Sequence, residues 1–270
     1  MGMQVTNPAS AGDINVHGFR IYFRNKTRLT ATVDASTTVP VENARWFAPG
    51  DILLIGGPGE SEQVTVDSIA GNTITLTVAT TGTFDQGAPL VRRNFWHMGH
   101  VRNPDWQQER EVQEIFSAIT GKSQKVKEIV TSVTKGINFE SISSADPLVR
   151  ALHTGNPRLA GVISGTDVFV DDVNSVDGEM LAVLPNAETG GIAFVMFRPA
   201  AQLSGDGFAQ GADGENEDAL SFTATFNADD SYTIPVALAA GNIPAPLGVV
   251  VKTPNDDLED VIDVFADLTA

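Results

Sequence analysis

The 270-residue chain contains no cysteine. This absence excludes disulfide bonds, catalysis by a thiol and zinc sites built on cysteine. The sequence also lacks any run of about 18 apolar residues, so it predicts no membrane-spanning helix. The opening Met1–Val5 lacks a basic segment followed by an apolar one, so we expect no secretory signal there.

Motifs for catalysis and cofactor binding are incomplete. Gly121-Lys122-Ser123 matches the end of a phosphate-binding loop, but Phe116 occupies the position where that loop requires its first glycine. His97 and His100 have helical spacing but no third metal-ligand motif. The three tryptophans and two tyrosines are few for the ring stacking that sugar-cleaving sites usually need. We therefore expect no enzyme activity, no cofactor and no metal.

Two acidic segments share features with calcium loops. Asp172–Glu179 places its glycine one position too late for an EF-hand. The second segment is the glycine-rich stretch Ser204–Asp218, which holds Asp213, Glu215, Glu217 and Asp218. Turn formation and solvation explain both compositions, so we interpret them as polar turns.

Positive charge is scarce in the C-terminal part of the chain. The net charge is −17, and residues 161–270 hold two Lys or Arg against nineteen Asp or Glu. Residues 1–95 and 96–160 are each nearly balanced. An acidic part of this kind repels nucleic acid. It is typical of a solvated surface, or of a channel lining along which DNA slides without binding.

Short alternating and β-branched segments predict a mainly β fold. His17–Arg24 alternates, with Arg20, Tyr22 and Arg24 on the polar face, and predicts a half-buried strand. Residues 1–28 form an N-terminal arm and this first strand. Later candidate strands are Gly165–Val170, Glu179–Leu184, Gly191–Phe197 and Ala219–Phe226, with two more between Thr233 and Val251.

Residues 29–91 have the pattern of a separate small β unit. Its candidate strands are Leu29–Val33, Asp51–Ile55, Glu62–Asp67 and Thr73–Val78. Glycine- and proline-rich turns separate them. The pattern resembles small SH3-like barrels, so we expect a β-barrel insertion before a core domain in residues 92–253.

One short helix has clear local signals. Asp146 before Pro147 is typical of an N-cap with proline at the first helical position, and Gly155 is a C-terminal stop. Leu148 and Leu152 lie at i,i+4 and are the candidates for contact with a core. The acidic tail 254–270 is amphipathic and either caps its own domain as a helix or docks on a neighbour.

The segment Pro104–Phe116 gives two conflicting predictions. Val112, Ile115, Phe116 and Ile119 recur with the period of a helix. The order of the segments around it resembles a known protein family in which this segment is a strand, and we therefore expect a strand.

The central stretch Phe95–Gly155 has a distinctive order of segments. It runs from the polar Pro104–Phe116 through a turn, Thr120–Lys127, and a β-branched run, Glu128–Thr134, to a second strand, Ile137–Glu140, and the short helix. This order resembles the major tail tube protein of long-tailed, siphovirus-like bacteriophages. The match covers roughly residues 96–161 and continues loosely to about residue 227.

The resemblance implies a β-sandwich or half-barrel with a short flanking helix, assembled by sheet-edge pairing into hexameric rings. The rings would stack into a tube that conducts DNA without binding it specifically. Implied partners are the tape measure, tail terminator and distal tail proteins. The implied location is the virion, after synthesis in the host cytoplasm.

Within this picture, a turn carrying Lys122, Lys125 and Lys127 is the candidate ring-stacking loop, since it could meet the acidic part of the next ring. Asp213, Glu215, Glu217 and Asp218 become candidates for the lumen or the outer surface. The alternatives are a phage decoration or head–tail joining protein, or a carbohydrate-binding, adhesin-like β module.

Overall fold

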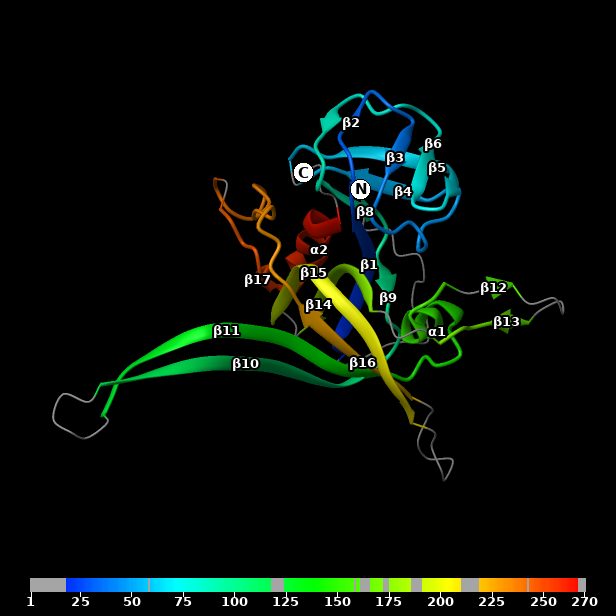
Figure 1. Ribbon diagram of the computed structural model, residues 1–270. Helices are drawn as coiled ribbons and strands as arrows, with labels where there is room; N and C mark the ends of the chain where they lie inside the picture. Colours follow the sequence, from blue (N-terminus) through cyan, green and yellow to red (C-terminus); the bar gives the residue numbers. More distant parts are fainter. Residues whose placement is uncertain are drawn as a thin grey trace.

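The computed structural model describes residues 18–57, 59–117, 124–157, 159–160, 166–171, 175–185, 191–209, 219–241 and 243–266. Within these ranges the chain is mainly β. Antiparallel strands form one large sheet in the order β10-β11-β16-β15-β14-β1-β8-β4-β5-β6-β3, with β17 beside β15 and β9 beside β1 (Figure 1). This sheet has two parts, and strand β1 belongs to both.

The larger part contains β1 (Arg20–Arg28), β9 (Trp96–His97), β10 (Val101–Ser117), β11 (Gln124–Ser141), β14 (Val176–Leu184), β15 (Ile192–Ala209), β16 (Ala219–Phe226) and β17 (Val249–Pro254). Beside it lie a two-stranded ribbon of β12 (Leu159–Ala160) and β13 (Asp167–Val168), and the helices α1 (Pro147–Thr154) and α2 (Leu258–Ala266). A short 3-10 turn, Asn255–Asp257, precedes α2.

The smaller part, which we call the insert (residues 29–91), contains β2 (Val33–Asp34), β3 (Thr38–Pro40), β4 (Ile52–Ile55), β5 (Glu62–Ala70), β6 (Thr73–Leu76), β7 (Thr83–Phe84) and the start of β8 (Pro89–Arg92). It has its own apolar core, which includes Leu53, Ile55 and Ile74. Its described strands do not close into the expected barrel. β2 and β7 form a separate ribbon, and the main ladder ends at the three-residue β3.

Strand β1 joins the two parts. Arg20–Asn25 pairs with β14, and Lys26–Arg28 pairs with β8. The prediction that this strand is half-buried is wrong, because Tyr22 and Arg24 are buried as well as Ile21 and Phe23. Apolar cores lie on both faces of the strand, so alternation of polar and apolar residues does not mark a solvated face here.

One of these two cores contains α1. Asp146 caps α1 by accepting hydrogen bonds from the amides of Leu148 and Val149, at 2.8 and 3.3 Å. Gly155 ends the helix at φ 72°, a left-handed conformation that glycine adopts readily. Leu152 is completely buried beside Phe139 and Phe222, and Leu148 packs at the border of this core.

The opposite core is closed by α2. Leu258, Ile262 and Phe265 are buried in it, and the Phe265 ring stacks on Phe197 at 4.9 Å between ring centroids. Of the two alternatives for the acidic tail, the structure therefore has a helix that caps its own domain. Between Thr233 and Val251 it has one isolated bridge, Thr233 to Pro244, and the start of β17.

Residues 104–116 belong to strand β10, so the helix prediction from periodicity is wrong. Every residue from Asp105 to Phe116 has a partner in β11. The partner strand includes β-branched Val130, Val133 and Thr134, which favour extended structure. Pairing with a distant strand therefore outweighs the local apolar period.

Candidate assembly interface

A two-stranded arm extends away from the body of the molecule (Figure 1). Strand β11 pairs with β16 only over Lys135–Ser141, whereas its pairing with β10 continues to Ser117 and Gln124. Residues 109–117 and 124–134, which we call the arm, have no third strand beside them in the described structure. At about 3.3 Å per residue, residues 124–134 span about 35 Å.

In the described structure the arm has strand pairing only between β10 and β11. Its described side chains at Glu109, Glu111, Gln113 and Glu114 are exposed. A two-stranded hairpin without further cover is marginally stable in water. Its outer strand also presents backbone N–H and C=O groups that can pair with another chain. Along the arm, the described structure therefore leaves strand edges open for pairing.

The base of the arm is anchored by aromatic rings. Trp106 packs against Phe19 and Phe226 with ring centroids 6.3 and 6.0 Å away, and 38 % of it stays exposed. The guanidinium of Arg198 lies over the Phe226 ring at 5.3 Å. At the start of β10, Arg102 pairs with Glu140 at 2.6 Å. These contacts fix the direction in which the arm leaves the sheet.

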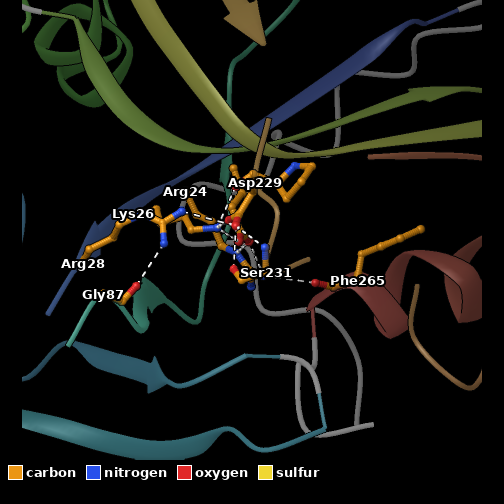
Figure 2. A network of polar contacts seen from close by, with 9 residues as sticks. Arg24, Lys26, Arg28, Gly87, Asp229, Ser231 and Phe265 are labelled. Carbon is orange, nitrogen blue, oxygen red and sulfur yellow. Dashed lines mark hydrogen bonds and ion pairs between the residues drawn. The ribbon is translucent and has the colours of Figure 1, made fainter. Parts of the chain in front are cut away.

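A buried cluster of charges ties the insert to the larger part (Figure 2). We call Arg24, Lys26, Arg28, Glu179 and Asp229 the junction cluster. Arg24 pairs with Glu179 at 2.7 Å, and Lys26 bridges Glu179 and Asp229 at 3.2 and 2.6 Å. Arg28 contacts Asp229 at 3.2 Å and donates to the Gly87 carbonyl of the insert at 2.9 Å.

The same cluster holds the C-terminal end of α2. Arg24 donates to the carbonyls of Ala266 and Phe265, both at 3.2 Å, and its guanidinium lies over the Phe95 ring at 4.2 Å. Helix ends leave carbonyls without partners inside the helix, and a cation there is favourable. Arg24 therefore connects β1, β14 and α2 at one point.

The surroundings of Asp229 lower the pKa of its carboxyl. Burial alone would raise the pKa of this carboxyl, but Lys26, with further contributions from Ser231 and Arg28, outweighs burial and lowers the pKa from 3.8 to about 2. Ser231 donates to the same carboxylate from its backbone amide at 3.1 Å. Asp229 is thus held as an anion across the ordinary pH range.

The sequence-predicted site residues do not gather at one described place. Lys122 lies outside the described residues, as do all four acids, Asp213, Glu215, Glu217 and Asp218. Lys125 and Lys127 pair with Phe116 and Ile115 at the far end of the arm, where the backbone alone is described. Leu148 and Leu152 lie on α1 as given above.

Sequence reasoning missed the junction cluster. Its signal was present in the spacing of Arg24, Lys26 and Arg28, since residues two apart on a strand share a face. What the sequence did not reveal is that this face meets Glu179 and Asp229, which are 155 and 203 residues away from Arg24 and Lys26.

The described residues contain no group of three or more side chains arranged to hold a metal ion. None of the described helices is long and apolar enough to cross a membrane. The sequence matches no protein-family model, and no curated protein shows significant similarity to it.

Proposed function

We propose that this chain is a structural virion protein: the subunit of stacked hexameric rings that form the tail tube of a long-tailed bacteriophage. The supporting observation is the arm, a hairpin of about 35 Å that has no third strand among the described residues and is continuous with a sheet that has open edges. Cyclic head-to-tail pairing of such edges supplies each strand with a neighbour.

The charge distribution fits a conduit for DNA. Residues 161–270 are strongly acidic, and acidic walls let a polyanion slide without sticking. Lys122, Lys125 and Lys127 are the candidate contacts to an acidic neighbouring ring. Tape measure, terminator and distal tail proteins are the partners that the resemblance implies, in the virion after synthesis in the host cytoplasm.

The insert is proposed to lie on the outside of the tube. The junction cluster supports a fixed orientation, because ion pairs and a hydrogen bond join β1 to Asp229 and to the insert carbonyl of Gly87. A ring reconstruction that places residues 29–91 on the lumen surface would contradict this orientation.

The experiment is negative-stain imaging of the purified chain over a range of protein and salt concentrations. We expect rings or tubes with a central hole. A variant in which an Asn-Gly turn replaces residues 109–134 joins Gln108 directly to its partner Lys135. It should stay folded and give single particles only.

The matched control places the same turn in the insert, as Gly71→Asn with Asn72→Gly at the β5–β6 hairpin. This control should assemble like the parent. Assembly of the arm-deleted chain, or monomers of the parent at all concentrations, would contradict the proposal. Monomers that attach to a capsid or to a glycan would favour a decoration or joining protein, or an adhesin-like module.

A further inference from the structure

The junction cluster holds a lysine amine directly against a carboxyl group (Figure 2). The Nζ atom of Lys26 lies 2.6 Å from Oδ2 of Asp229, and the two side chains are 9 % and 1 % exposed. The nitrogen is therefore at most one C–O bond farther from the carboxyl carbon. Fixing two reacting atoms at such a separation gives an effective concentration on the order of 10⁵ M or more.

A second carboxylate contacts the same amine. Oε1 of Glu179 lies 3.2 Å from Nζ of Lys26, and the side chain of Glu179 is 3 % exposed. Its other oxygen, Oε2, lies 2.7 Å from the guanidinium of Arg24. Arg24 thus holds Glu179 with Oε1 toward Lys26. A carboxylate within hydrogen-bond reach of a reacting nitrogen can take its proton as a general base.

The other carboxyl oxygen of Asp229, Oδ1, is surrounded by donors. It accepts from the backbone amide of Ser231 at 3.1 Å and from the hydroxyl of the same residue. The guanidinium of Arg28 lies 3.2 Å away. In the resting chain these donors favour the carboxylate. They are also placed to stabilise the negative charge that Oδ1 acquires when a nucleophile adds to the carboxyl carbon.

We propose that Lys26 and Asp229 form an isopeptide bond, with Glu179 as the catalytic base. Lys26 first passes one proton to Oδ2 of Asp229, which gives a neutral amine and a carboxylic acid. Nζ then adds to the carboxyl carbon, and the C=O electron pair moves to Oδ1. Glu179 takes a second proton from the nitrogen and delivers it to Oδ2, which leaves as water when the C=O bond re-forms. The third proton stays on the amide nitrogen.

The surroundings favour the product. The reaction replaces two buried charges by a neutral amide, and buried charges are costly even when paired. Lys26 also lines a cavity of about 290 Å³, which has room for the released water. The bond joins β1 to the segment after β16, 203 residues away. Only chains that have not reacted keep the ionised Asp229.

The test is the intact mass of the full chain, measured under denaturing conditions after incubation at neutral pH. We expect a mass lower than that of the sequence by one water molecule. Proteolysis should then release a branched peptide in which Lys26 is joined to Asp229. The test does not depend on the proposed function, because all reacting groups belong to one subunit.

Four variants make the test specific. Lys26→Arg keeps the positive charge but removes the amine, so it should have its full sequence mass. Glu179→Gln removes the base and should also keep its full mass. Asp229→Asn should lose one ammonia in place of one water, because the side-chain amide nitrogen is then the leaving group. The matched control is Lys252→Arg at an exposed lysine outside the cluster, which should lose water as the parent does.

Three results would overturn the inference or part of it. A parent chain with its full sequence mass would overturn it outright, and this result does not require any variant to fold. A loss of water that persists in Lys26→Arg would place the reaction elsewhere in the chain. A loss of water that Glu179→Gln leaves unchanged would overturn the role of Glu179 as the base.

Discussion

Strands β1 and β10 are both long and antiparallel, but their surroundings differ completely. β1 has strand partners on both edges and apolar cores on both faces, and over Ile21–Asn25 it is buried. β10 has one strand partner, and the side chains described in its outer half are exposed. The first strand is completed within its own chain, whereas the second has one open edge in the described structure.

From this difference we expect β1 to govern the folding stability of one subunit and the arm to govern association between subunits. Changes at β1 and the junction cluster should affect the folding of a single subunit, because their partners belong to that subunit. Changes in the arm should leave folding nearly unaffected and alter association.

The largest effect is expected from Arg24→Met, which leaves Glu179 buried without its closest partner. Losing one member of a buried pair costs about 3–5 kcal/mol of unfolding free energy. The control is Arg20→Ala, which removes an exposed pair with Glu259 at 3.8 Å and should cost less than about 1 kcal/mol. Urea unfolding measures both, and equal costs would contradict the account.

The next largest effect is expected from Leu152→Ala, which truncates a fully buried leucine of α1. It should lower the free energy of unfolding by about 2–5 kcal/mol. Leu148→Ala on the same helix should cost clearly less, since Leu148 is only partly buried. The same unfolding assay measures the difference. A larger loss for Leu148→Ala would show that the face of α1 toward the core is misassigned.

Acid should weaken the junction cluster through Asp229. Its pKa is lowered from 3.8 to about 2 in the folded chain, so its contribution is present above pH 4 and is lost as the pH falls from about 4 to 2. A shift of this size corresponds to about 2 kcal/mol. Unfolding of Asp229→Asn should lack this part of the pH dependence, whereas Asp230→Asn, an exposed neighbour, should retain it.

The smallest effect on folding is expected from replacing the three candidate lysines together, as Lys122→Ser, Lys125→Ser and Lys127→Ser. We expect the free energy of unfolding to change by less than about 0.5 kcal/mol, the range usual for surface substitutions. Association at low salt should slow on the order of tenfold, and the difference should vanish at 1 M salt, where charges are screened. Light scattering during assembly measures both; unchanged association at low salt would remove these lysines from the contact.

Local signals explain which parts of the fold were predictable from sequence. The helix α1 is specified by adjacent residues, because Asp146, Pro147 and Gly155 set its two ends. Strand β16 coincides with the alternating run Ala219–Phe226. In both cases the deciding interactions are encoded within about ten residues, so a single sequence suffices to find them.

Distant partners explain what was not predictable. The apolar period of Val112, Ile115 and Phe116 favours a helix, but pairing with β11 determines the strand. Arg24 has the place of a solvated residue in an alternating strand, but its partners Glu179 and Phe265 come from β14 and α2. Such contacts depend on topology, which no local pattern contains.

The most direct test of the account is amide hydrogen exchange in the arm, compared between separated subunits and assembled protein. The account predicts that residues 109–117 and 124–134 exchange rapidly in the separated subunit and become strongly protected on assembly. Residues 20–28 of β1 should be protected in both states. Equal protection of the arm in both states would show that the arm is complete within one chain, and would contradict its role in assembly.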